Sequence, residues 1–119
     1  MYRMKYLVCI LFLGQSIFLS AQMLDGSLLD EGRKLVTKTD FVIYDANEGV
    51  LFYTLAVDRK GKVTSATLLG EGTTVTFTPT RMKARNYLVT LQFEEGTHYP
   101  QFHHVRVKVT VKAPPSNQE

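Results

Sequence analysis

The sequence predicts an α+β fold in which a small antiparallel sheet of three to four strands packs against one main helix in two layers. Three observations predict it. Two strand-like runs, 50–58 and 62–69, are separated by a short segment containing glycine, as in a β-hairpin. A helical pattern follows at 80–91, and an alternating run occupies 105–112. One helix and a few antiparallel strands bury their apolar faces as two layers.

The chain begins with the three-part pattern of a secretory signal peptide. Arg3 and Lys5 form a basic start, a mainly apolar run extends to Leu19, and Ala21 is the small residue that a signal peptidase requires. We therefore expect cleavage after Ala21, removal of residues 1–21, and export to the periplasm or cell surface of a Gram-negative bacterium. The alternative is an uncleaved membrane anchor. It is disfavoured because polar residues interrupt the apolar run, which a spanning helix needs to be mainly apolar.

The mature chain is expected to run from Gln22 to Glu119 and to form one domain without a membrane span. The single cysteine, Cys9, leaves with the signal, so disulfides are excluded, as is a disulfide-stabilised secreted scaffold. The formal charge of +3 falls to +1 when Arg3 and Lys5 are removed, so charge gives no reason to expect a nucleic-acid partner.

The N-terminal segment of the mature chain, residues 22–48, is predicted to be partly flexible. Its leucines fall near one helical face, but Gly26 and Gly32 limit the helix to about one turn. A short strand is expected at 41–44.

The hairpin is the clearest unit in the chain. Gly61 is expected to adopt a positive φ at its turn. Both faces of the run 50–58 are substantially apolar, which indicates an inner strand with a layer packed on one side.

The helix is predicted to begin with Thr78 as N-cap and Pro79 in the first position. Its inward side chains repeat at helical spacing: Ala84, Leu88 and Leu91. Its outward side chains are mostly basic: Arg81, Lys83 and Arg85.

The final strand alternates strictly, with valines on one face and a basic row on the other. The row consists of His104, Arg106, Lys108 and Lys112. We treat this strand as a sheet edge, where charge either prevents unwanted strand pairing or receives a partner. The tail, residues 113–119, is predicted to be disordered.

The mature chain shows no catalytic constellation and no cofactor motif. Its serines lie outside a nucleophile elbow. His98 could bind zinc or copper together with His103 or His104, but the last two are adjacent and should point to opposite faces. We therefore predict no metal site, no cofactor and no enzymatic activity.

Residues 57–64 read Val-Asp-Arg-Lys-Gly-Lys-Val-Thr, and this hairpin resembles the V-D-x-x-G-x-V hairpin of the TonB C-terminal domain family. In that family a helix, an aromatic-containing segment and an alternating final strand follow, which correspond here to 80–91, 91–96 and 105–111. The resemblance covers residues 49–112. It implies an α+β domain that binds partner proteins by adding a strand to a sheet edge. The Pro-rich spacer of the energy transducers is lacking, since 21–49 contains no proline.

These observations favour a small exported, non-enzymatic module that pairs an edge strand with a protein or peptide of the cell envelope. The basic row on the final strand is the predicted contact surface. The alternatives are a structural subunit that associates with copies of itself, and a small metal-dependent enzyme built on the histidines.

Overall fold

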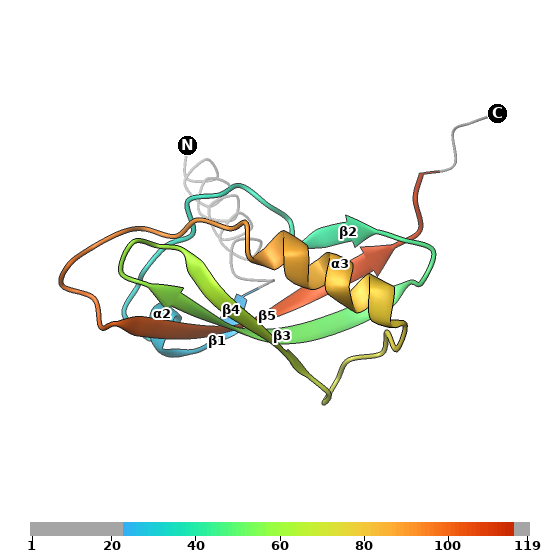
Figure 1. Ribbon diagram of the computed structural model, residues 1–119, viewed down its shortest axis with the longest axis horizontal. Helices are drawn as coiled ribbons and strands as arrows, with labels where there is room; N and C mark the ends of the chain where they lie inside the picture. Colours follow the sequence, from blue (N-terminus) through green and yellow to red (C-terminus); the bar gives the residue numbers. More distant parts are fainter. Residues whose placement is uncertain (1–22, 116–119) are drawn as a thin grey trace, which may run out of the picture.

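The computed structural model describes residues 23–115, which form one five-stranded sheet with two helices (Figure 1). The elements in chain order are β1 (Met23–Asp25), α2 (Ser27–Asp30), β2 (Val42–Tyr44), β3 (Gly49–Asp58), β4 (Val63–Leu69), α3 (Thr78–Leu88) and β5 (Phe102–Lys112). α2 is a single turn, so α3 is the main helix. The predicted α+β class is confirmed, with five strands in place of three to four. The predicted signal peptide and residues 116–119 lie outside the described residues.

The strand order places β5 in the middle of the sheet. β5 pairs with β3 along its whole length in antiparallel register, from Gly49 opposite Val111 to Asp58 opposite Phe102. Its other side pairs with β1 in antiparallel and with β2 in parallel orientation. The prediction that the final strand forms an edge is therefore wrong. The strand expected at 41–44 is present as β2, but a run of three residues does not show which strand it pairs with, and β1 is equally short. The partner of both strands lies far along the chain.

β3 and β4 form the predicted hairpin, and β3 is the predicted inner strand between β5 and β4. The turn is closed by the Asp58 carboxylate, which accepts hydrogen bonds from the backbone N–H groups of Lys60 and Lys62 at 2.9 and 3.0 Å. Gly61 has a φ of 84°, as expected. A side chain at Gly61 would also collide with the carbonyl of Phe93, so the loop after α3 can approach only a glycine here.

α3 differs from its predicted limits at both ends. Its N-cap is Phe77, whose extended backbone precedes the first turn, and Thr78 lies inside the helix without a capping hydrogen bond. The helix ends at Leu88, because the chain then turns to place Phe93 beside the hairpin, where its N–H donates to the Gly61 carbonyl at 2.8 Å. Leu91 is buried as predicted, but from this loop.

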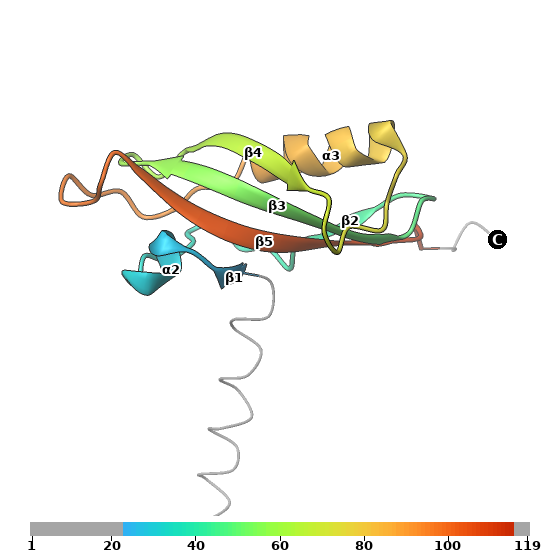
Figure 2. The ribbon, with the colours of Figure 1, turned by 90° about the horizontal axis from the view of Figure 1, so that it is seen from below.

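The core lies between α3 and one face of the sheet (Figure 2). The predicted alternation holds, since the valines of β5 and every second residue of β3 are buried. The sheet residues of the core are Ile43, Leu51, Tyr53, Leu55, Val57, Val63, Ala66, Val105, Val107, Val109 and Val111. The opposite face of β3 and β4 carries no helix, and its side chains are half-buried or exposed.

The segment before residue 49 contributes two strands and a fully buried Leu28 to this same fold. The sheet thus extends beyond the unit expected at 49–112. Gly26 makes this docking possible: its φ is 133°, and a Cβ there would overlap the carbonyl of His104 and the Cα of Val105.

Candidate functional site

The predicted basic row lies on the helix-free face of β5. His104, Arg106 and Lys112 are exposed, and Lys108 is half-buried. Arg106 is already engaged, because it donates hydrogen bonds of 2.8 and 3.2 Å to the Asp25 carboxylate of β1, and these bonds raise the pKa of Arg106. The row therefore offers fewer free charges than the sequence implies, and it runs along a central strand.

The long open edge of the sheet belongs to β4, which pairs only with β3 among the described strands. The backbone N–H groups of Val50 and Asp58 point toward the β4 side, so the even-numbered residues of β3 direct their backbone hydrogen bonds to β4. The β4 residues that pair with these even-numbered residues, such as Thr67 with Thr54, direct their own backbone groups to β3. By the alternation of antiparallel ladders, the backbone groups of Ala66 and Leu68 point away from the sheet.

This edge lacks the usual protection against strand pairing. The seven residues of β4 contain no charge and no proline, and four of them are Val, Thr or Ser. β1 and β2, on the other side of the sheet, are protected by being only three residues long. β4 is therefore the part of the described sheet best suited to accept another strand.

α3 lies over the inner face of this edge and partly covers it. Ala66 is only 8% exposed, whereas Thr67 is exposed and Leu68 is half-buried. An added strand would therefore contact both the β4 backbone and the flank of α3 that faces β4.

A buried polar cluster joins the N-terminal segment to the rest of the fold. Arg33 is 2% exposed, and it donates hydrogen bonds to the carbonyls of Asp58 and Glu94 at 2.6 and 2.8 Å. Its guanidinium carbon lies 4.2 Å from the ring centre of Tyr99. Burial lowers the pKa of Arg33, and the charges of the surrounding groups oppose that shift.

The same cluster contains one of the candidate metal ligands. Arg33 lies 3.1 Å from Nδ1 of His103, and since a guanidinium can only donate, this contact assigns the His103 proton to Nε2. Nε2 lies 3.3 Å from the Glu31 carboxylate without forming a hydrogen bond. His103 is fully buried and His104 is exposed on the other face, as predicted from their adjacency. His103 and His104 therefore do not face one ion, and His98 lies against another side chain of this region, with its ring centre 4.2 Å from that of Tyr99.

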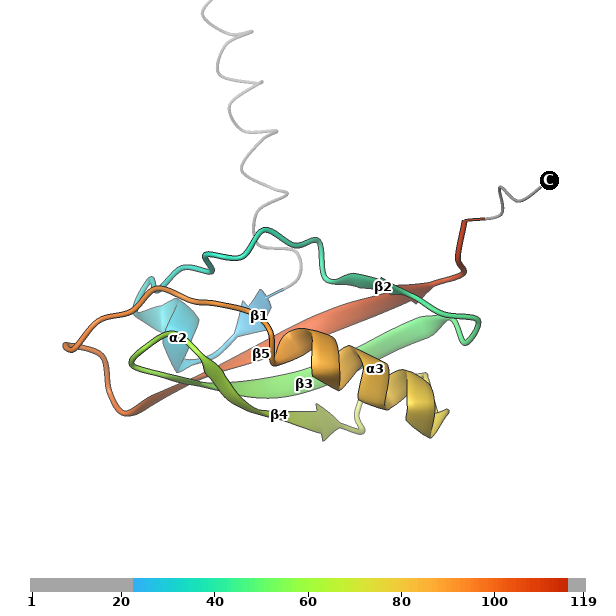
Figure 3. The ribbon, with the colours of Figure 1, turned by 45° about the horizontal axis from the view of Figure 1, so that its top comes forward.

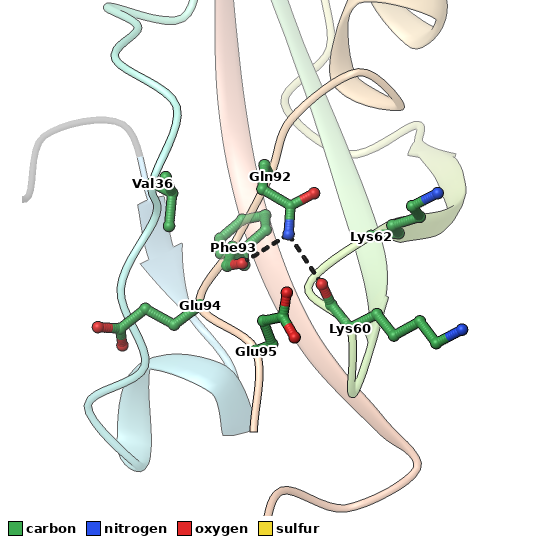
Figure 4. Close-up of a pocket in the computed structure, with 7 residues that line it drawn as sticks. All are labelled: Val36, Lys60, Lys62, Gln92, Phe93, Glu94 and Glu95. Carbon is green, nitrogen blue, oxygen red and sulfur yellow. Dashed lines mark hydrogen bonds between the residues drawn. The ribbon is translucent and has the colours of Figure 1, made fainter. Parts of the chain in front are cut away.

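A surface pocket of about 450 Å³ opens beside the start of β4 (Figure 4). Its lining combines two lysines and two glutamates with apolar groups: Val36, Lys60, Lys62, Gln92, Phe93, Glu94 and Glu95. The Gln92 side chain lies between Lys60 and Phe93 and donates hydrogen bonds to both of their carbonyls. Figure 4 shows both lysine side chains pointing away from Glu94. The pocket therefore does not gather charges of one sign that would bind a ligand of the opposite charge.

No family model, curated protein or solved structure matches this chain. Within residues 23–115, no helix has the length and apolar character needed to cross a membrane. The same part of the chain contains no group of three or more His, Cys, Asp or Glu side chains placed to hold a metal ion.

Sequence reasoning missed β4 as the open edge. The available signal was the lack of charge between Val63 and Leu69, which contrasts with the charged alternation of β5. That signal was not decisive, because an uncharged strand is equally typical of a sheet centre.

Proposed function

We propose that this protein is a small exported, non-enzymatic module that binds a protein of the bacterial cell envelope by adding a strand of that partner to β4. The unprotected edge of β4 carries this proposal. Strand addition uses main-chain hydrogen bonds for affinity and neighbouring side chains for selectivity, so it needs an open edge of several residues. The export signal predicted at residues 1–21 is the reason for proposing a partner in the cell envelope.

The resemblance to the TonB C-terminal domain family also supports the proposal, because it implies binding by strand addition. The chain has the hairpin, main helix and final strand in the order that the resemblance implies. Membership of that family stays a prediction. The binding edge proposed here is β4, because the final strand is paired on both sides.

The test is selection from a displayed library of random peptides on the purified protein, followed by NMR titration with the synthesised winner. We expect the largest backbone amide shifts at Ala66 and Leu68, together with slower hydrogen exchange at these two amides. Leu68→Pro should abolish the effect, because it removes an outward donor while leaving the ladder to β3 intact. Shifts centred on residues 102–112, or no selectable peptide, would contradict the proposal.

Leu68→Ala is the matched control. It removes the same side chain but keeps the N–H, so peptide binding should persist at a similar affinity. If Leu68→Ala abolishes binding as completely as Leu68→Pro does, the contact is made by the side chain and strand addition at β4 is excluded.

Self-association through the same edge is the second candidate function, since an uncharged edge also suits a second copy of the chain. Sedimentation velocity on the protein alone separates the two. A concentration-dependent dimer lost in Leu68→Pro would favour the self-associating subunit.

A further inference from the structure

The flank of α3 that faces β4 is basic. Lys83 points the other way, since it donates to the Tyr44 carbonyl and lies 3.8 Å from the Asp45 carboxylate at the end of β2. Residues two positions away on a helix are turned by about 200°, so Arg81 and Arg85 lie on the flank opposite Lys83. β2 and β4 lie on opposite sides of the sheet, which places both arginines toward the open edge.

The two arginines are also aligned with the outward backbone groups of β4. Leu68 pairs with Tyr53 of β3, whose hydroxyl donates to the Arg81 carbonyl at 2.6 Å, so the Arg81 backbone lies above the sheet at the level of Leu68. α3 runs antiparallel to β4 (Figure 3). Because Arg85 is one turn after Arg81, it therefore lies on the side of Arg81 toward the start of β4. A helical turn advances about 5.4 Å, close to the roughly 6.6 Å between alternate residues of a strand.

These charges are not neutralised within the described fold. α3 contains no Asp or Glu, and neither arginine forms an ion pair within residues 23–115. Arg81 donates from its Nε to the carbonyl of Val75, just before α3, at 2.8 Å, and no other residue of 23–115 accepts a hydrogen bond from its terminal nitrogens.

We propose that the strand received by β4 is acidic, with carboxylates at two alternate positions on its helix-facing side that pair with Arg81 and Arg85. This inference rests on the proposed strand addition and adds the chemistry of the partner. It also disfavours a second copy as the occupant. Antiparallel pairing of two β4 edges would place both α3 helices on the same face, with the arginine flanks opposed.

The experiment compares two synthetic peptides of about eight residues, rich in Val and Thr, that differ only in carrying Glu or Gln at two alternate positions. Both are titrated into the full chain while the amides of Ala66 and Leu68 are followed by NMR. We expect the Glu peptide to bind about five-fold more tightly, from two partly exposed ion pairs, and this advantage to shrink in high salt.

Arg85→Glu should remove or reverse the preference while leaving Gln-peptide binding in place. Arg85 is exposed, and its side chain forms no hydrogen bond or ion pair within residues 23–115, so this variant tests charge without depending on Arg81. The matched control is Lys108→Gln with Lys112→Gln, a comparable loss of positive charge on the helix-free face, which should leave the preference unchanged.

The outcomes separate the two proposals. If both peptides shift the β4 amides with equal affinity, the acidic partner is wrong and strand addition stands. If the Lys108 and Lys112 variant abolishes the preference, the acidic partner binds the row on β5 and the role of α3 is wrong. If neither peptide affects the β4 amides, both proposals fail together.

Discussion

The two edges of the sheet differ: one is covered by further strands and the other is open. Beyond β5, the edge is closed by β1 and β2, and the Ser27 hydroxyl oxygen accepts a hydrogen bond from the His104 N–H at 3.0 Å. The buried Arg33 ties the same N-terminal segment to the end of β3 and to the loop at Glu94. Beyond β3, the sheet ends with β4, whose outer backbone groups meet no further strand of the described residues. The contrast shows that an open edge need not be the most charged strand: here the charged strand is central and the uncharged one is outermost.

The largest expected effect comes from removing the contacts of Arg33, which hold the N-terminal segment of the closed side against the rest of the fold. Arg33→Met should lower the free energy of unfolding by about 3 kcal/mol, because it removes the hydrogen bonds to the carbonyls of Asp58 and Glu94 and leaves Nδ1 of the buried His103 without its donor. Urea denaturation followed by circular dichroism measures it. Lys38→Met makes a similar change at an exposed position and should have little effect. Equal stability of the two variants would show that the cluster does not hold the N-terminal segment.

A smaller effect is expected from Gly26→Ala, which interferes with docking of β1 and α2 against β5. The new Cβ would overlap the His104 carbonyl and the residue would keep a φ of 133°, so we expect a loss of about 2 kcal/mol. Gly32→Ala is the matched control. Gly32 also has a positive φ, 73°, but no atom lies within 4 Å of its Cβ position, so only backbone strain of about 1 kcal/mol is added. Thermal or urea denaturation of the pair separates steric overlap from strain. A larger loss in Gly32→Ala than in Gly26→Ala would contradict the close approach.

The smallest effect on stability is expected from a substitution at Arg106. It tests whether an exposed ion pair holds β1 on β5, or whether buried contacts do so. The two hydrogen bonds of Arg106 to Asp25 are solvent-exposed, so Arg106→Ala should leave the urea midpoint without a resolvable change. Amide exchange at Met23 and Asp25 should rise slightly, because the strand loses a side-chain contact. A clear drop in the urea midpoint would mean that this exposed ion pair contributes strongly to holding β1 on β5.

Much of the fold was predictable because its signals are local. The turn at Gly61, the alternation of β5 and the burial of Ala84 and Leu88 all follow from residues a few positions apart. What the sequence could not supply was the position of β5 in the sheet. That position depends on contacts such as Asp25 with Arg106, which are 81 residues apart and have no periodic signature.

The candidate site was less predictable than the fold for the same reason. The basic row of β5 was correctly assigned to one face, yet whether that strand is outermost is a property of the whole sheet. The alignment of Arg81 and Arg85 with β4 likewise requires knowing on which side of α3 Lys83 meets β2. The helical pattern alone gives only that the three side chains point outward.

The central position of β5 has a consequence for the order of assembly. β5 is the last element of the described chain, but β1, β2 and β3 all pair with it. The β3–β4 hairpin can form as soon as residue 69 is available, whereas β1 and β2 have no strand to join until β5 is present. Closing these long loops makes folding slow relative to a chain of local contacts. A growing or threading polypeptide with this topology stays largely unfolded until its final strand is free, and then completes its sheet in a single late step.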